Sequence, residues 1–85
     1  MKSLEALRKE IDMLDAEIAE RLTRRFAVVS EIGEYKKLNG LPVVNAARED
    51  AVIAKIRAFG VTPAEQDALE AVYRTVILQA RTLEK

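Results

Sequence analysis

Two basic residues interrupt an apolar stripe in the first half of this 85-residue chain. Arg25 and Lys36 take positions where the rhythm of the stripe calls for apolar residues. A cation directed into a core is costly unless it meets an anion, so the pair predicts an anionic ligand held between the two side chains. The stripe itself recurs at three- and four-residue steps, as in a helix with one buried face: Leu4, Leu7, Ile11, Leu14, Ile18, Leu22, Val29 and Ile32.

Helical geometry places both cations on one face. Arg25 and Lys36 are eleven residues apart, so they lie within about 20° of each other and about 16 Å apart along the axis. Arg24 lies about 120° from Lys36 and should face water. Arg8 is about 25 Å from Arg25 on the same rod. In an antiparallel pair of such helices Arg8 would reach the partner's pocket, which predicts a site composed of two chains.

Each candidate also has a plain structural interpretation. Arg8, Arg25 and Lys36 could flank a helical seam and form salt bridges between chains. Asn45 could act only as a helix cap, and Arg48 and Glu49 could be solvated charges on a short helix. Glu84 could form an ion pair with Arg81 within one helix. Spacing alone therefore supports a helical dimer and leaves both interpretations of the charges open.

Composition narrows the chemistry. The chain has no Cys and no His, which argues against disulfides, thiolate nucleophiles, zinc sites and His-assisted serine catalysis. Its 14 basic and 14 acidic residues balance, which argues against a general nucleic-acid surface. There is neither an apolar signal region at the N-terminus nor an apolar run of about 18 residues, so we expect a cytoplasmic protein without a membrane partner.

Local signals predict an all-α fold with three helices in a single domain, residues 1–85. We expect helices over residues 3–38, over residues 46–58 and from Thr62 onward. Ser3 and Asn45 are predicted N-caps, and the Thr62-Pro63-Ala64-Glu65 segment forms a capping box. The first helix ends at Asn39-Gly40, followed by Pro42. Within it, Gly33 indicates either close helix packing or room for a ligand.

The first helix is too long for a compact monomer. Its 36 predicted residues span about 54 Å, whereas a compact chain of this length has a radius of gyration of about 12 Å. Most of the stripe must therefore be covered by another chain. We predict an intertwined homodimer in which the long helices pair across a twofold axis.

Several short segments follow one another in a characteristic order along nearly the whole chain: Leu7-Arg8-Lys9-Glu10-Ile11-Asp12, Leu14-Asp15, Leu22-Thr23-Arg24-Arg25, Ile32-Gly33-Glu34-Tyr35-Lys36, Pro42-Val43 and Arg48-Glu49. This ordered set resembles the all-helical chorismate mutases. The resemblance implies a pericyclic rearrangement of chorismate to prephenate, without a covalent intermediate, a cofactor or a metal, in sites shared between the two subunits of a homodimer.

The resemblance also implies a role for each candidate. Arg8 from the partner subunit and Arg25 would each hold a substrate carboxylate, for which a bidentate guanidinium is suited. Lys36 would donate to the ether oxygen, where negative charge develops as the C–O bond breaks. Arg48 would support the pocket and the side-chain carboxylate of the substrate. Glu49 would accept the ring hydroxyl.

Two positions depart from the bacterial pattern of that family. Asn45 stands where Asp is common near the ring hydroxyl, and it can still cap the helix and bind a hydroxyl. Glu84 stands where many bacterial members have Gln as the second donor to the ether oxygen, and fungal members also have Glu there. An ionised Glu84 would repel the developing charge, whereas a protonated Glu84 would donate to it. We therefore expect turnover to fall as pH rises.

Three other functions remain open for this scaffold. An isochorismate-pyruvate lyase and an aminodeoxychorismate mutase would use a similar cationic pocket, and Asn45 and Glu84 keep both in consideration. A non-catalytic module that binds prephenate or a larger synthase is the third. The retained cations argue against a dead site, and chorismate mutase is the function that Gly33-x-x-Lys36 and Arg48-Glu49 favour.

Overall fold

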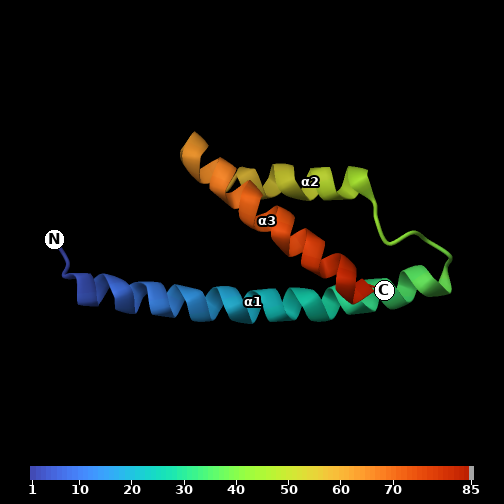
Figure 1. The fold of residues 1–85 in the computed structure, drawn as a ribbon, viewed down its shortest axis with the longest axis horizontal. Helices are drawn as coiled ribbons and strands as arrows, with labels where there is room; N and C mark the ends of the chain where they lie inside the picture. The colour runs from blue at the N-terminus through green and yellow to red at the C-terminus, as the bar shows by residue number, and fades with distance from the viewer. Residues whose placement is uncertain (85) are drawn as a thin grey trace.

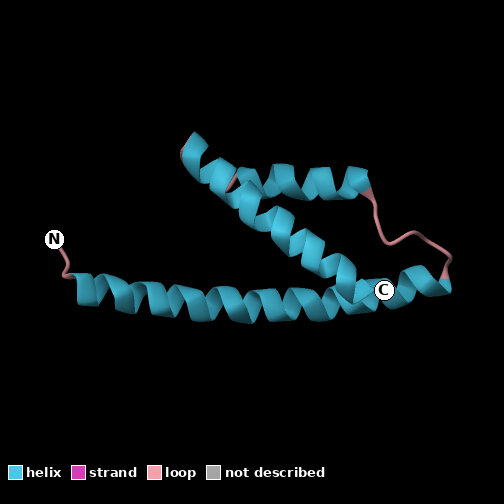
Figure 2. Cartoon of the chain, viewed as in Figure 1, coloured by secondary structure: helices cyan, strands magenta, loops and turns pink. Residues whose placement is uncertain are grey.

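The computed structural model describes residues 1–84, and these form three helices and no strands (Figures 1 and 2). Helix α1 spans Leu4–Leu38, α2 spans Ala46–Arg57 and α3 spans Pro63–Glu84. The all-helical fold class is confirmed. The three helix starts and the ends of α1 and α2 lie within a residue or two of their predicted positions.

The helix starts form through the predicted caps. The Ser3 hydroxyl and the Asn45 side-chain oxygen each accept a backbone N–H of the following turn, at 3.1 Å. At the start of α3 the box is reciprocal: the Glu65 backbone N–H donates to the Thr62 hydroxyl and the Glu65 carboxylate accepts the Thr62 N–H, both at 3.1 Å. A cap of this kind stabilises a helix by about 1 kcal/mol. The caps therefore fix where the chain turns and where each helix can present its side chains.

Helix α3 is the central element of residues 1–84. It packs against both α1 and α2, while α1 and α2 do not contact each other, and α3 runs diagonally between them in Figure 1. At the far end of α1, Gly40 has a φ of 64°, a left-handed conformation that suits Gly and turns the chain back toward α2. The small apolar core joins the C-terminal half of α1, the middle of α2 and the second half of α3: Val29, Ile53, Val76, Ile77 and Ala80.

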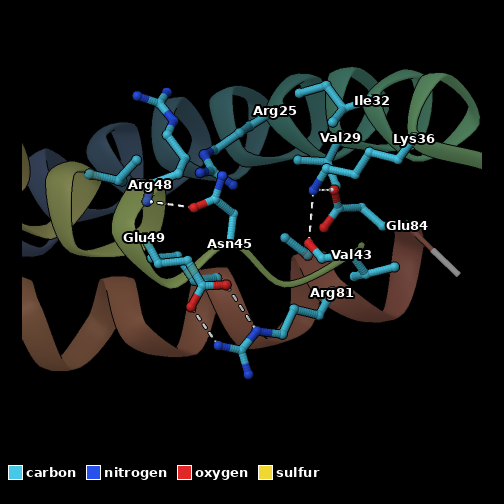
Figure 3. Close-up of a pocket in the computed structure, with 13 residues that line it drawn as sticks. Arg25, Val29, Ile32, Lys36, Val43, Asn45, Arg48, Glu49, Arg81 and Glu84 are labelled. Carbon is cyan, nitrogen blue, oxygen red and sulfur yellow. Dashed lines mark hydrogen bonds and ion pairs between the residues drawn. The ribbon is translucent and has the colours of Figure 1, made fainter. Parts of the chain in front are cut away.

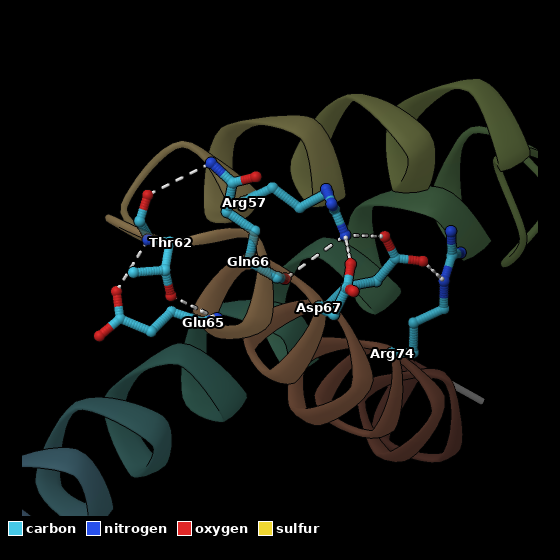
Figure 4. A network of polar contacts seen from close by, with 8 residues as sticks. Arg57, Thr62, Glu65, Gln66, Asp67 and Arg74 are labelled. Atoms are coloured by element: carbon cyan, nitrogen blue, oxygen red, sulfur yellow. Dashed lines mark hydrogen bonds and ion pairs between the residues drawn. The ribbon is translucent and has the colours of Figure 1, made fainter.

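A polar network fixes the junction between α2 and α3 (Figure 4). One terminal nitrogen of Arg57 donates to the carboxylates of Asp67 and Glu70, both at 3.0 Å. Arg74 donates to the other oxygen of Glu70 at 3.2 Å. Because Arg57 ends α2 and its acceptors lie in the first half of α3, the network holds the two helices at a defined angle.

The N-terminal half of α1 projects away from the rest of the chain. The molecule extends over 55 Å, and its radius of gyration is 16.0 Å, against about 12 Å for a compact chain of this size. Here the apolar stripe is uncovered, with exposed fractions of 63% at Leu4, 42% at Leu7, 55% at Ile11, 51% at Leu14 and 55% at Ile18. Despite its length, α1 is too polar to cross a membrane, and α2 and α3 also fall short of a membrane span within residues 1–84.

Candidate active site

All three helices and the loop before α2 line one cleft of about 240 Å³, shown in Figure 3. Its walls bring together six of the seven predicted site residues: Arg25, Lys36, Asn45, Arg48, Glu49 and Glu84. Apolar side chains, among them Val29, Ile32 and Ile77, fill the space between these charged groups. Arg25 and Glu84, far apart in the sequence, meet in this cleft because α3 returns to the C-terminal half of α1.

Lys36 lies where the C-terminal ends of α1 and α3 border the cleft, between two oxygen acceptors. Its ammonium donates to the Glu84 carboxylate at 2.6 Å and to the Val43 backbone carbonyl at 2.8 Å. The side chains of Lys36 and Glu84 are only 18% and 10% exposed, so the pair is largely shielded from water. An ammonium has three N–H donors. One donor of Lys36 is therefore left for a ligand in the cleft.

Gly33 permits α3 to end against α1. A Cβ atom at residue 33 would lie 2.7 Å from the Cα atom of Glu84, closer than real Cβ contacts occur. Of the two interpretations of this glycine, close helix packing is confirmed. The same contact keeps the end of α3, and with it Glu84, close to Lys36.

Arg25 faces the cleft with unused donors. Its guanidinium lies over the ring of Tyr73 on α3, with 5.2 Å from the Cζ atom to the ring centroid. One terminal nitrogen is buried without a hydrogen-bond partner in residues 1–84. A buried donor of this kind is costly unless something accepts its proton. The ring of Tyr73 orients the guanidinium, and its free N–H groups suit an anionic ligand.

Arg48 and Asn45 stand together at the start of α2. The Asn45 side-chain oxygen caps α2 by accepting the Arg48 backbone N–H, as predicted (Figure 3). The Arg48 guanidinium is exposed and makes no ion pair within residues 1–84. The helix N-terminus adds partial positive charge at the same point. This end of the cleft is therefore also suited to an anion.

Glu49 is held by an arginine that the sequence did not single out as a site residue. Arg81 on α3 donates from Nε to one oxygen of Glu49 at 3.0 Å and from a terminal nitrogen to the other. The hydrogen bond from Arg81, helped by its charge, holds the pKa of Glu49 below the usual value of 4.5 against a smaller opposing effect of burial. The alternative pairing of Arg81 with Glu84 within α3 is wrong, since Glu84 pairs with Lys36.

Arg8 and Arg24 lie outside this cleft. Both are exposed on α1, and neither is among the residues that line the cleft. The exposure of Arg24 confirms that it faces water. Arg8 lies on the projecting half of α1, so a role in the site requires a second chain.

The charges of the cleft do not cancel. Four cationic and two anionic side chains line it, which leaves a formal excess of two positive charges. Lys36 pairs with Glu84 and Arg81 pairs with Glu49. The excess therefore resides on Arg25 and Arg48, at the two positions with free guanidinium donors.

The fold and the cleft define an all-helical protein with one cleft that carries a formal excess of positive charge. Residues 7–85 match the family model described as chorismate mutase type II, and the chain belongs to that family. The form II structure of chorismate mutase from Thermus thermophilus superposes with a TM-score of 0.89 at 29% identity, covering 98% of this chain and 94% of that one.

Three curated relatives contain a segment similar to this chain. The bifunctional chorismate mutase/prephenate dehydratase of Aquifex aeolicus (strain VF5) is 38% identical, and the T-protein of Enterobacter agglomerans is also 38% identical. The alignments cover 100% and 95% of this chain but only 25% and 22% of those longer proteins. The 4-amino-4-deoxychorismate mutase of Streptomyces pristinaespiralis is 32% identical over 95% of this chain and 64% of its own length.

Proposed function

We propose that this chain rearranges chorismate to prephenate in a cleft completed by a second copy of the chain. The observation that carries the proposal is the pair of unneutralised guanidinium groups, Arg25 and Arg48, beside a lysine with one free donor. Chorismate carries two carboxylates, which match the formal excess of two positive charges. Family membership supports the same reaction.

The protein needs only to position the substrate and to stabilise the charge that develops in the transition state. The ether C–O bond of the substrate breaks while a new C–C bond forms, and no proton or electron passes to the protein. Arg25 and Arg48 hold the carboxylates, while the remaining N–H of Lys36 meets the negative charge that grows on the ether oxygen. The Glu84 carboxylate accepts a hydrogen bond from that ammonium at 2.6 Å and thereby holds Lys36 in position.

A second copy supplies the missing wall in this proposal. The uncovered stripe on the N-terminal half of α1 supports an intertwined homodimer, because five apolar side chains there are 42% or more exposed. The long helices pair antiparallel, so Arg8 of one chain enters the cleft of the other. Arg8 then joins Arg25 and Arg48 as a third cation without an ion-pair partner, and it binds a carboxylate together with Arg25.

The direct test is a chorismate-depletion assay with product analysis. The wild-type protein should consume chorismate and yield prephenate. Lys36→Ala should lose at least about 100-fold in kcat/KM, the usual cost of removing one transition-state donor, while circular dichroism shows an unchanged helical fold. Lys37→Ala is the matched control, since Lys37 is the exposed neighbour in the last turn of α1 and should retain full activity.

A second candidate is an aminodeoxychorismate mutase, which the Streptomyces relative favours. Incubation with chorismate, isochorismate and 4-amino-4-deoxychorismate separates the candidates by product. Release of pyruvate from isochorismate would identify a lyase instead. Turnover of none of the three would contradict an enzymatic function of this cleft and favour a binding module.

A further inference from the structure

The ion pair between Glu49 and Arg81 is the feature of the cleft that the proposed reaction does not use. Both oxygens of the Glu49 carboxylate accept hydrogen bonds from one guanidinium, so the pair is bidentate (Figure 3). The Glu49 side chain is 18% exposed and that of Arg81 36%. This arrangement orients the carboxylate toward α3 and fixes its direction.

Arg81 also determines the charge that a ligand meets at this wall. It lowers the pKa of Glu49 and at the same time neutralises the charge of that carboxylate. The neighbouring groups add no compensating negative charge: Asn45 is neutral, and Arg48 is an unpaired cation. A cationic substituent placed here would meet a carboxylate whose charge Arg81 already neutralises, and a nearby guanidinium. A neutral substituent would escape this repulsion.

We propose that Arg81 determines which ring substituent the cleft accepts. By holding Glu49 in a bidentate ion pair, Arg81 makes the site favour a substrate with a neutral hydroxyl over one with an ammonium group at the same position. The inference rests on the proposed function, because it concerns chorismate and its 4-amino-4-deoxy analogue. Arg81 is a positioning residue for specificity and takes no part in the bond changes.

The test compares kcat/KM for chorismate and 4-amino-4-deoxychorismate in the wild type and in Arg81→Met. The wild type should prefer chorismate. Removal of Arg81 leaves Glu49 free to pair with the ammonium group, so the preference should fall by about tenfold, as expected for one charge at close range in a partly exposed site. Most of the change should occur in KM for the amino substrate.

Further variants separate specificity from a merely structural role. Arg74→Met removes a guanidinium that pairs with Glu70 on its own helix, outside the residues that line the cleft. Its charge acts on Glu49 without a hydrogen bond, so the preference should change far less than in Arg81→Met. Adding Glu49→Gln to Arg81→Met removes the freed carboxylate and should restore the preference for chorismate. If Arg81→Met does not fold, Arg81→Gln, of similar hydrogen-bonding character but uncharged, serves in its place.

The outcomes are distinct. Folded Arg81 variants with the wild-type ratio of kcat/KM would overturn the inference while leaving the proposed function intact. An equal loss of both activities would also overturn it, because Arg81 would then act only on the stability of the site. A wild-type protein that converts neither compound would refute the proposed function, and the inference would fall with it.

Discussion

The backbone of Glu84 rests directly on Gly33. A Cβ atom at residue 33 would lie 2.7 Å from the Cα atom of Glu84 and 2.8 Å from its carbonyl oxygen. This contact holds the last turn of α3 against α1. Lys36 lies three residues beyond Gly33 on α1, nearly one helical turn, so Glu84 can reach its ammonium at 2.6 Å.

Gly33→Ala should therefore impair catalysis more than folding. The added methyl group must displace the end of α3, while the gain in helix propensity of about 1 kcal/mol offsets part of the cost. We expect a Tm close to that of the wild type and a loss of kcat of about tenfold or more, because a small misplacement in a site is costly. A wild-type kcat would contradict this account.

Gly40→Ala provides the matched control for that experiment. Gly40 has a φ of 64°, and a Cβ atom there would meet no other atom within 4 Å. The substitution should cost about 1 kcal/mol through the left-handed backbone alone. Activity should be retained, since the residue lies outside the cleft.

Glu84 should limit the activity through its negative charge. Its carboxylate accepts a hydrogen bond from Lys36 at 2.6 Å in the cleft, so it opposes the negative charge that develops on the ether oxygen. Glu84→Gln removes that charge and offers an amide donor in its place, so kcat/KM for chorismate should rise by about tenfold. Glu34→Gln changes an exposed carboxylate of α1 and should leave kcat/KM unchanged. A Glu84→Gln variant no faster than the wild type would refute the role assigned to Glu84.

The Glu49–Arg81 pair should make stability depend on pH in a defined direction. The hydrogen bond from Arg81 lowers the pKa of Glu49 below 4.5 in the folded state, so the unfolded chain takes up its proton first as pH falls. The contribution is therefore complete above that value and is lost as pH falls through the folded-state pKa. Wild type and Arg81→Met should differ in Tm most at neutral pH and converge in acid.

Thermal unfolding followed by circular dichroism at several pH values measures this effect. Both side chains are partly exposed, so the difference should amount to a few degrees at most. Glu49→Gln removes the titrating group and should converge with the wild type over the same range. A gap between wild type and Arg81→Met that stays constant down to pH values well below 4.5 would show that the carboxylate does not carry the effect.

Local patterns predicted the helices well because their signals are local. The caps at Ser3, Asn45 and Thr62 act within one turn, and each is present as predicted. The ion pairs of the site, in contrast, join side chains of different helices. Lys36 and Glu84 are 48 residues apart, and periodicity within a helix carries no information on which helix end meets which side chain.

The acceptor of Arg81 could not be predicted from the sequence either. Within α3 the nearest opposite charge in sequence is Glu84, and the spacing of three residues suits an ion pair within one helix. The packing of α3 against α2 instead brings Glu49 within reach of Arg81. Helix packing therefore overrides the pairing with Glu84 that the spacing in the sequence favours.

The proposed composite site makes a quantitative prediction for mixtures of two variants that should each be inactive, Arg8→Ala and Arg25→Ala. Each homodimer lacks one arginine in both sites. A heterodimer carries both substitutions in one site and neither in the other, provided that Arg8 serves the partner. With random pairing on co-expression, half of the dimers are hybrid and half of their sites are intact, so activity should recover to about a quarter of the wild-type level. If Arg8 serves its own chain, every site lacks one arginine and the mixture stays inactive. A different affinity tag on each variant confirms that hybrids form, since only a hybrid dimer is retained by both resins, and activity per site distinguishes the two arrangements.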